Sequence, residues 1–171
     1  MMTPGPGTPG GGRTRGFTLV EMMVALAVLA VLASIAVPPT TRLLERHRLQ
    51  AAAQTLVADL AEARFEAVRR RQPVHVAPQA GTDWCWSLAT TPGCDCREAP
   101  DCALRQHGAS DFRGVRLERA GALVFGAEGL PDTPLGARLV AGGEALEVSV
   151  GPTGRARICS PERASVRFPA C

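Results

Sequence analysis

The chain has 171 residues, 46% of them apolar, and its formal net charge is +3. These values allow one packed domain with appendages, and so small a charge identifies no class of partner. The sequence contains no Gly-x-Ser-x-Gly elbow, no metal-binding helix motif and no phosphate-binding loop, and its three histidines are scattered. The motifs therefore argue against an enzyme, and neither a cofactor nor a bound metal is expected.

The N-terminal part of the chain predicts a membrane segment. Residues 1–12 are rich in proline and glycine and are expected to form no helix. An apolar run of residues 17–37 follows Arg13 and Arg15 and carries one charge, Glu21. As a helix this run would span about 31 Å, close to the ~30 Å of a hydrocarbon core. The arginines should stay in the cytoplasm, which places the rest of the chain outside.

An ordinary secretory signal peptide is one interpretation of this run. The small residues Ser34–Ala36 are spaced for cleavage before Val37. The run is long for a signal core, however, and a carboxylate inside it costs about 2.5–3.5 kcal/mol on insertion scales. Glu21 therefore favours a functional segment that is kept in the mature protein.

The junction "RGFTLVE", Arg15–Glu21, resembles the class III signal of type IV prepilins and pseudopilins. The resemblance implies a leader of residues 1–16, cleavage after Gly16 by a prepilin peptidase, and a methylated amine on Phe17. It also implies a helix kink at Pro38. Glu21 is then implied to meet the α-amino group of a neighbouring subunit, because an ammonium and a carboxylate buried together compensate each other and one alone does not.

Residues 38–72 are predicted to continue the helix in amphipathic form. Arg69–Arg71 suit the negative end of a helix dipole, and Gln72 with Pro73 ends the helix. These arginines are expected to form a solvated helix end, with a nucleic-acid patch as the alternative. The apolar stripe recurs at three- and four-residue steps and contains Leu49, Ala53, Leu56, Leu60, Ala63 and Ala67.

Residues 73–171 are predicted to form a β-rich domain outside the membrane. Short runs rich in valine and leucine are separated by glycine or proline, which is typical of strands joined by turns. A long helix packed on antiparallel sheet gives an α+β layer arrangement, and the resemblance to type IV prepilins implies the type IV pilin-like fold. The runs are "PVHVAP", "WCWSLAT", "GVRLERA", "ALVFGA", "ARLVAG", "ALEVSV", "GRARICS" and "SVRFPA".

Three stretches of this half, "DWCW", "LVFGAEG" and "EVSVGPTGRARI", resemble the GspH/FimT minor pilins and pseudopilins. The cysteine-rich insert 91–108 lies outside the resemblance. Pseudopilins of the GspH kind belong to type II secretion, whereas FimT-type minor pilins belong to type IV pili and some are implicated in DNA uptake.

A possible DNA contact lies in "GRAR", where Gly154, Arg155 and Arg157 match an element that some FimT proteins are held to use for DNA. In an extended strand the two arginines would share a face, roughly 6.6 Å apart. Guanidiniums bind phosphate oxygens in bidentate geometry. No aromatic ladder accompanies the arginines, so base stacking is expected to be minor. The alternative is an exposed edge strand whose arginines discourage edge pairing.

Six cysteines in an exported domain predict disulfides rather than a metal site. Sequence leaves the pairing open, with a bond between Cys159 and Cys171 expected to hold the C-terminal tail. Cys94 and Cys96 should pair with other cysteines, since a bridge across one residue is strained. The six are Cys85, Cys94, Cys96, Cys102, Cys159 and Cys171.

Three hypotheses follow for the function. The first is a FimT-like minor pilin of the bacterial inner membrane that assembles with other pilins and contacts double-stranded DNA for uptake. The second is a GspH-like minor pseudopilin with protein partners only, and the third is a signal-cleaved periplasmic binding domain. The arginine pair favours the first.

Overall fold

A computed structural model describes residues 16–98, 100–162 and 167–171, and describes the backbone but not the side chains of residues 35–40 and 100. The chain divides into two compact units, Met1–Pro39 and Thr40–Cys171. Disulfides and a packed core belong to the second unit. Arg13 and Arg15 of the expected leader lie outside the described residues.

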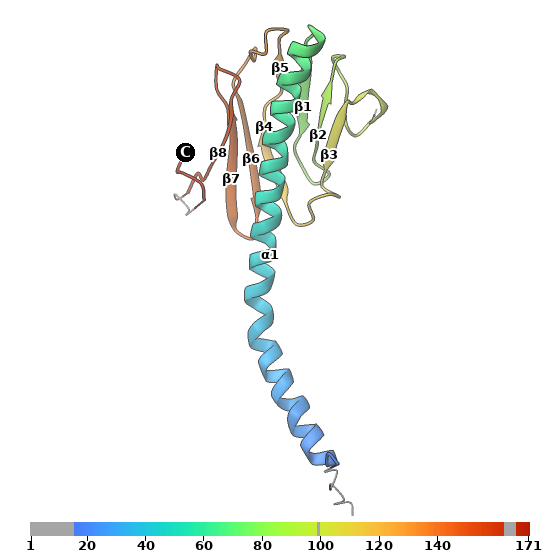
Figure 1. The fold of residues 1–171 in the computed structure, drawn as a ribbon, viewed down its shortest axis with the longest axis vertical. Coiled ribbons are helices and arrows are strands. Elements are labelled where there is room, and N and C mark those ends of the chain that lie inside the picture. Colours follow the sequence, from blue (N-terminus) through green and yellow to red (C-terminus); the bar gives the residue numbers. More distant parts are fainter. Residues whose placement is uncertain (1–15, 99, 163–166) are drawn as a thin grey trace, which may run out of the picture. The chain divides into compact units, whose positions relative to one another are not determined.

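One helix, α1 (Leu19–Arg70), contributes to both units (Figure 1). Its backbone is helical through Pro38 and Pro39, and the predicted kink at Pro38 stays a prediction. Within the described residues, no helical segment has both the length and the apolar character that a membrane crossing requires. Every described side chain of residues 16–34 is exposed in the single chain.

The second unit contains, within the described residues, two four-stranded antiparallel sheets. One has the order β3-β2-β1-β5 and the other β4-β6-β7-β8, with α1 running along both (Figure 1). A 3-10 turn, Pro100–Cys102, lies in the cysteine-rich insert. The strands are β1 (Val74–Gln79), β2 (Cys85–Ala89), β3 (Arg105–Gly108), β4 (Arg116–Ala120), β5 (Leu123–Phe125), β6 (Leu135–Ala141), β7 (Glu144–Val150) and β8 (Ala156–Cys159).

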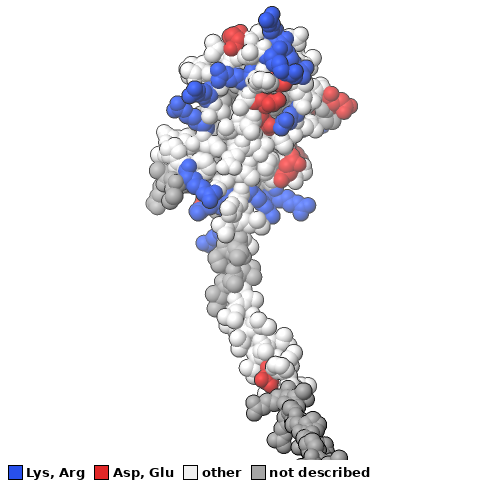
Figure 2. Space-filling view, viewed as in Figure 1, with Lys and Arg blue, Asp and Glu red and all other residues white. Residues whose placement is uncertain are grey.

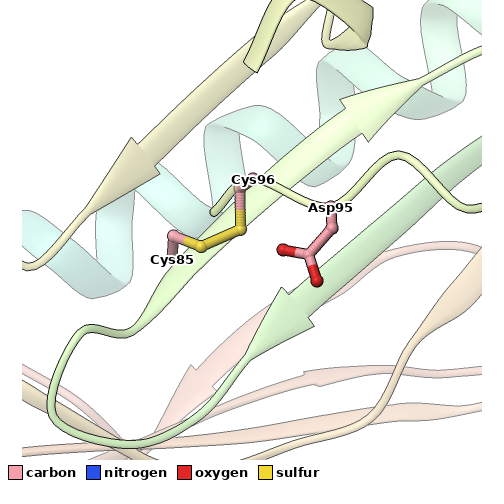
Figure 3. A group of neighbouring side chains, drawn as sticks. All are labelled: Cys85, Asp95 and Cys96. Carbon is pink, nitrogen blue, oxygen red and sulfur yellow. A yellow bond between two sulfur atoms is a disulfide. The ribbon is translucent and has the colours of Figure 1, made fainter. Parts of the chain in front are cut away.

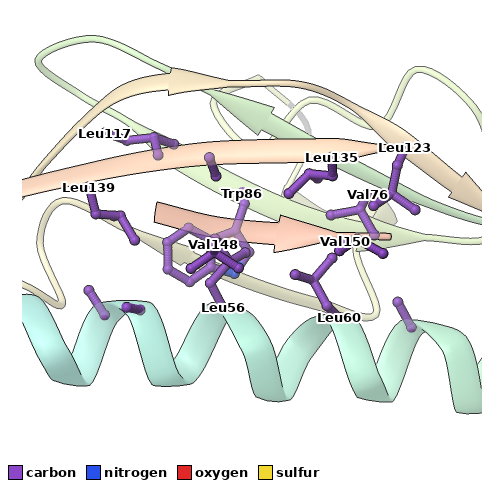
Figure 4. Packing of buried hydrophobic residues seen from close by; sticks show 14 of the residues in the cluster. Leu56, Leu60, Val76, Trp86, Leu117, Leu123, Leu135, Leu139, Val148 and Val150 are labelled. Atoms are coloured by element: carbon purple, nitrogen blue, oxygen red, sulfur yellow. The ribbon is translucent and has the colours of Figure 1, made fainter. Parts of the chain in front are cut away.

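The core lies between α1 and the inner faces of both sheets (Figure 4). All six residues of the predicted helical stripe are buried, and Ala53, Ala63 and Ala67 have no exposed surface. These alanines leave room for the sheets to approach the helix, while Leu56 and Leu60 fill the space between the helix and the strands. The predicted α+β fold, with the helix packed on antiparallel sheet, is confirmed.

Two strand predictions differ from the structure. β3 was not expected, because "RQHG" is polar and becomes a strand only by pairing with β2. "SVRFPA" was expected to be a strand, but its described part makes only an isolated bridge between Ser160 and Ala170. Residues 163–166 lie outside the described residues.

The cysteine-rich insert covers the outer face of β2. Every residue of β2 is buried, although alternate side chains point away from the core. Ser87 donates a hydrogen bond to the Cys94 carbonyl at 3.0 Å, and disulfides join Cys85 to Cys96 and Cys94 to Cys102. The outer face of β2 is therefore covered by a disulfide-linked loop and not by a second hydrophobic layer.

Candidate functional site

The turn before β8 and the first residues of β8 contain the predicted DNA-binding motif. The Gly154 N–H donates to the Gly151 carbonyl at 2.9 Å, and Gly154 has a φ of 73°. Glycine adopts this left-handed conformation readily, whereas other residues pay about 1–2 kcal/mol for it. The backbone of the turn therefore requires the first residue of the motif to be glycine.

Gly154 also occupies a place where no side chain fits. A Cβ added there would lie 2.9 Å from the carbonyl oxygen of Gly129 and 3.4 Å from Nε of Arg64 on α1. The turn thus packs directly on the loop between β5 and β6 and on the Arg64 side chain. Gly154 acts as a positioning residue, because this close approach sets where Arg155 leaves the turn.

Arg155 and Arg157 are both exposed. Arg157 lies opposite Ser149 in the pairing of β7 with the edge strand β8. The intervening Ala156 and the next residue, Ile158, pack on the core, so strand alternation directs the arginines outward. Among the described residues, no carboxylate forms an ion pair with either arginine.

A groove of about 520 Å³ lies beside this turn, between α1 and the start of β8. Its walls are mostly apolar and include the ring of Phe65, which is 59% exposed, and Val68, which is 49% exposed. We call it the β8 groove. It is lined by Val57, Ala61, Arg64, Phe65, Val68, Gly154, Arg155 and Ala156.

Arg64 and Phe65 were not recognised from the sequence as site residues. Both belong to the predicted amphipathic helix, far from Arg155 in the chain, and only the packing of β8 against α1 brings them to the motif. An aromatic residue off the buried stripe was the one available signal, since such a residue has no place in the core.

Arg69 and Arg70 at the end of α1 differ from Arg155 and Arg157 in having a carboxylate partner among the described residues. Glu66 accepts a hydrogen bond from Nη2 of Arg69 at 2.7 Å and one from Nε of Arg70 at 2.5 Å. These hydrogen bonds lower the pKa of Glu66 to about 2. Figure 2 shows basic side chains near the end of α1 and around the β7–β8 turn, with acidic side chains interspersed. Proximity to carboxylates, rather than the number of arginines, distinguishes the two groups.

A polar cluster around a buried carboxylate lies on the other flank of α1, and we call Asp59, Trp86, Arg105 and His107 the Asp59 cluster. Asp59 is 1% exposed and accepts a hydrogen bond from Nε1 of Trp86 at 2.7 Å. Arg105 and His107 of β3 lie 3.7 and 3.6 Å from its carboxylate. Burial raises the pKa of Asp59, while Trp86, His107 and Arg105 oppose that rise. The cluster joins β2 and β3 to the helix.

All six cysteines form disulfides, including the predicted bond between Cys159 and Cys171. Cys85, Asp95 and Cys96 offer potential metal-ligand atoms within 4.8 Å of one another. Figure 3 shows, however, that the two sulfurs are bonded to each other, so they offer no thiolate. One carboxylate is left, which does not make a metal site.

The start of α1 gives Glu21 a local structural role. The Thr18 hydroxyl accepts a hydrogen bond from the backbone N–H of Glu21 at 3.2 Å, and Thr18 thereby caps the helix. Glu21 lies in the first turn, where a carboxylate interacts favourably with the helix dipole. The predicted cleavage point, Gly16 and Phe17, lies just before this cap and is exposed.

Two family models match the chain. The one described as "Type II transport protein GspH" matches residues 52–154, and the "Prokaryotic N-terminal methylation motif" matches residues 12–37. The first match covers α1 from Ala52 to the turn at Gly154. The second covers the proposed leader junction, Phe17 and Glu21.

Curated relatives are also pilins. The chain is 31% identical to the pilin-like protein PilA1 of Thermus thermophilus, over 84% of this chain and 97% of the relative. It is 30% identical to the type IV major pilin protein PilA of Myxococcus xanthus, over 78% of this chain and 62% of that protein.

Solved structures share the fold. The type IV minor pilin FimU of Pseudomonas aeruginosa has a TM-score of 0.55 at 25% identity, covering 71% of this chain and 96% of FimU. The minor pseudopilin EpsH of the Vibrio cholerae type 2 secretion system has a TM-score of 0.50 at 18% identity, covering 68% and 99%. Such proteins are structural subunits rather than enzymes. The chain belongs to the GspH family of type IV pilin-like proteins.

Proposed function

We propose that the chain is a FimT-like minor pilin that assembles into a type IV pilus and contacts DNA through Arg155 and Arg157. The observation that carries the DNA contact is the pair of exposed, outward-directed arginines without a carboxylate partner among the described residues. Gly154 supports them through a turn that only glycine fits.

Assembly rests on the N-terminal segment. A prepilin peptidase cleaves between Gly16 and Phe17, the new amine is methylated, and the apolar helix holds the chain in the inner membrane with residues 73–171 in the periplasm. The matched methylation motif supports this step. The exposed apolar side chains of the segment support it too, because a helix that is apolar all round needs lipid or neighbouring subunits around it. In the fibre, Glu21 pairs with a neighbour's α-amino group.

The DNA contact follows from the chemistry of the arginines. A guanidinium binds two phosphate oxygens at once and keeps its charge at any physiological pH. Contacts of this kind are made to the backbone, so binding is independent of sequence. Each contact releases counterions, and affinity should fall by about 0.9 log units per log unit of salt for each contact with a duplex.

A GspH-like pseudopilin with a structural role in type II secretion is the second candidate. It is favoured by the family model that spans residues 52–154 and by the fold shared with EpsH. In that case Arg155 and Arg157 protect the edge strand β8 from pairing with other strands.

DNA titration separates the two candidates. Fluorescence anisotropy with the full-length chain in detergent, at two salt concentrations, should show weak binding that falls steeply with salt. Arg155→Ala combined with Arg157→Ala should abolish most of the DNA binding. The matching lysine variants should keep part of the binding, because lysine keeps the charge but lacks the bidentate geometry. Arg69→Ala with Arg70→Ala is the control and should have little effect. Absence of wild-type binding at low salt favours the pseudopilin.

Intact-mass measurement of membrane-extracted protein tests the processing step. The expected mature chain begins at Phe17 and carries a methylated amine. A chain that begins at Val37 would instead identify residues 1–36 as a secretory signal and remove the assembly proposal.

A further inference from the structure

The β8 groove can contact a partner through an apolar surface as well as through positive charge. An exposed aromatic ring, Phe65, lies in its wall, and Arg64 and Arg155 both line it. No residue that lines the groove is acidic. A complementary partner therefore has a flat apolar face and negative charges on either side of it.

We propose that the β8 groove takes an unstacked base of single-stranded DNA, with Phe65 as the stacking surface and Arg64 and Arg155 on the flanking phosphates. This inference rests on the proposed function, because it assigns a form of DNA and a further contact to the same site. It adds two residues of α1 to the interface and predicts a preference for single strands.

Stacking explains why a single strand fits better than a duplex. In a duplex each base face is covered by its neighbours, whereas an unpaired base can place a face on an aromatic ring. The interaction tolerates any base, since every base has a π face, and this agrees with backbone contacts that carry no sequence information. The apolar Val68 beside Phe65 would lie against the edge of the base.

The half-buried side chain of Arg64 packs beside two turns of the domain. A Cβ at Gly129 would lie 3.3 Å from Cγ of Arg64, and one at Gly154 would lie 3.4 Å from its Nε. The Arg64 side chain thus passes close to two turns, each with a glycine at the contact. A side chain confined in this way loses less conformational entropy when it binds a phosphate.

This placement changes the expectation from the sequence that base stacking would be minor. That expectation considered aromatic residues near Arg155 in the chain, and none occurs there. The ring comes instead from α1, whose packing against β8 places Phe65 in the same groove as Arg155.

The test compares an oligothymidine with a duplex of equal length by fluorescence anisotropy, using the full-length chain in detergent at two salt concentrations. Phe65→Ala should weaken single-strand binding roughly 5- to 150-fold. Its salt dependence should not change, since a stacked base releases no counterions. Arg155→Ala should reduce the salt slope by about 0.7, the value for one contact with a single strand. Phe65→Tyr should keep the affinity.

Leu104→Ala is the matched control, because Leu104 is a 43% exposed apolar residue that does not line the groove. It should bind like wild type. If Phe65→Ala binds single strands as wild type does, or if the duplex binds as tightly as the single strand, the stacking proposal is wrong while the arginine contact stands. If no DNA form binds, both proposals fall. Reduced recovery of Phe65→Ala in sheared fibres, with unchanged DNA binding, would make the groove a subunit interface and also overturn the inference.

Discussion

The polar groups on the two flanks of α1 differ in whether they have partners inside the domain. Toward β2 and β3, the carboxylate of Asp59 is buried and meets Trp86, Arg105 and His107. Toward β8, Arg155 is exposed without a carboxylate partner among the described residues and shares its groove with an exposed aromatic ring. A charged group with partners inside the domain is already satisfied there, whereas a charge without such partners is available to a ligand.

The arginines at the end of α1 show the same dependence on carboxylate partners. Arg69 and Arg70 are as exposed as many surface arginines, but both bind Glu66. Their charge is partly neutralised before any phosphate arrives. The number of basic residues in a segment is therefore a poorer guide to a nucleic-acid site than the absence of neighbouring carboxylates.

The largest expected effect is on the flank toward β2 and β3. Trp86→Ala removes a fully buried ring and the donor to Asp59, and should lower the free energy of unfolding by about 3–5 kcal/mol. Urea denaturation measures it. At temperatures where the variant is folded, its DNA affinity should equal that of wild type. A parallel loss of DNA affinity in the folded protein would show that the two flanks are coupled.

A smaller effect is expected at the turn before β8. Gly154→Ala should destabilise the domain by more than the about 1–2 kcal/mol that a left-handed φ requires, because its Cβ would also meet the Gly129 carbonyl. DNA affinity should fall as the turn shifts. Gly114→Ala is the control: its φ of 82° is similar and nothing lies within 4 Å of the added Cβ. Equal destabilisation of the two variants would contradict the close-packing argument.

A pH effect is expected from the Asp59 cluster. Because burial raises the folded-state pKa of Asp59, the folded state binds more protons than the unfolded state between the unfolded and folded pKa values. This group's contribution to stability should therefore decrease as pH rises through that window. Asp59→Asn, which keeps an acceptor for Trp86, should lack this slope in denaturation series from pH 3 to 7. The same slope in both proteins would assign it to other groups.

The smallest effect is expected at Glu66. Its contribution to the pH dependence of stability has the opposite sign to that of Asp59. Its folded pKa of about 2 lies below the ordinary value of 4.5, so its stabilisation is present above pH 4.5 and disappears as pH falls toward 2. Glu66→Gln should lose that part of the acid dependence. It should also release Arg69 and Arg70 and steepen the salt dependence of DNA binding. An unchanged salt slope would mean that their carboxylate partner is not what keeps these arginines out of the interface.

Local patterns in the sequence were sufficient for the long helix, for most of the strands and for the fold class. The spacing of Leu49, Leu56 and Leu60 predicts a helix with one buried face, and the alternation in "ALEVSV" predicts a strand. Both periods are set by backbone geometry over a few residues, so they can be read without knowing the partner surface. The disulfide between Cys159 and Cys171 was also predicted, as a bond that holds the C-terminal tail.

Tertiary structure alone decided which residues share a site. β3 is a strand because β2 pairs with it, and its Arg105 and His107 reach Asp59 only through that pairing. Phe65 and Arg155 line the same groove because β8 begins beside α1. These contacts join residues far apart in the chain, and they depend on the order of strands in the sheets, which neither helical nor strand periodicity encodes. The arginine motif and the apolar helix can be read from local sequence, whereas the presence or absence of a partner for each charge depends on these long-range contacts.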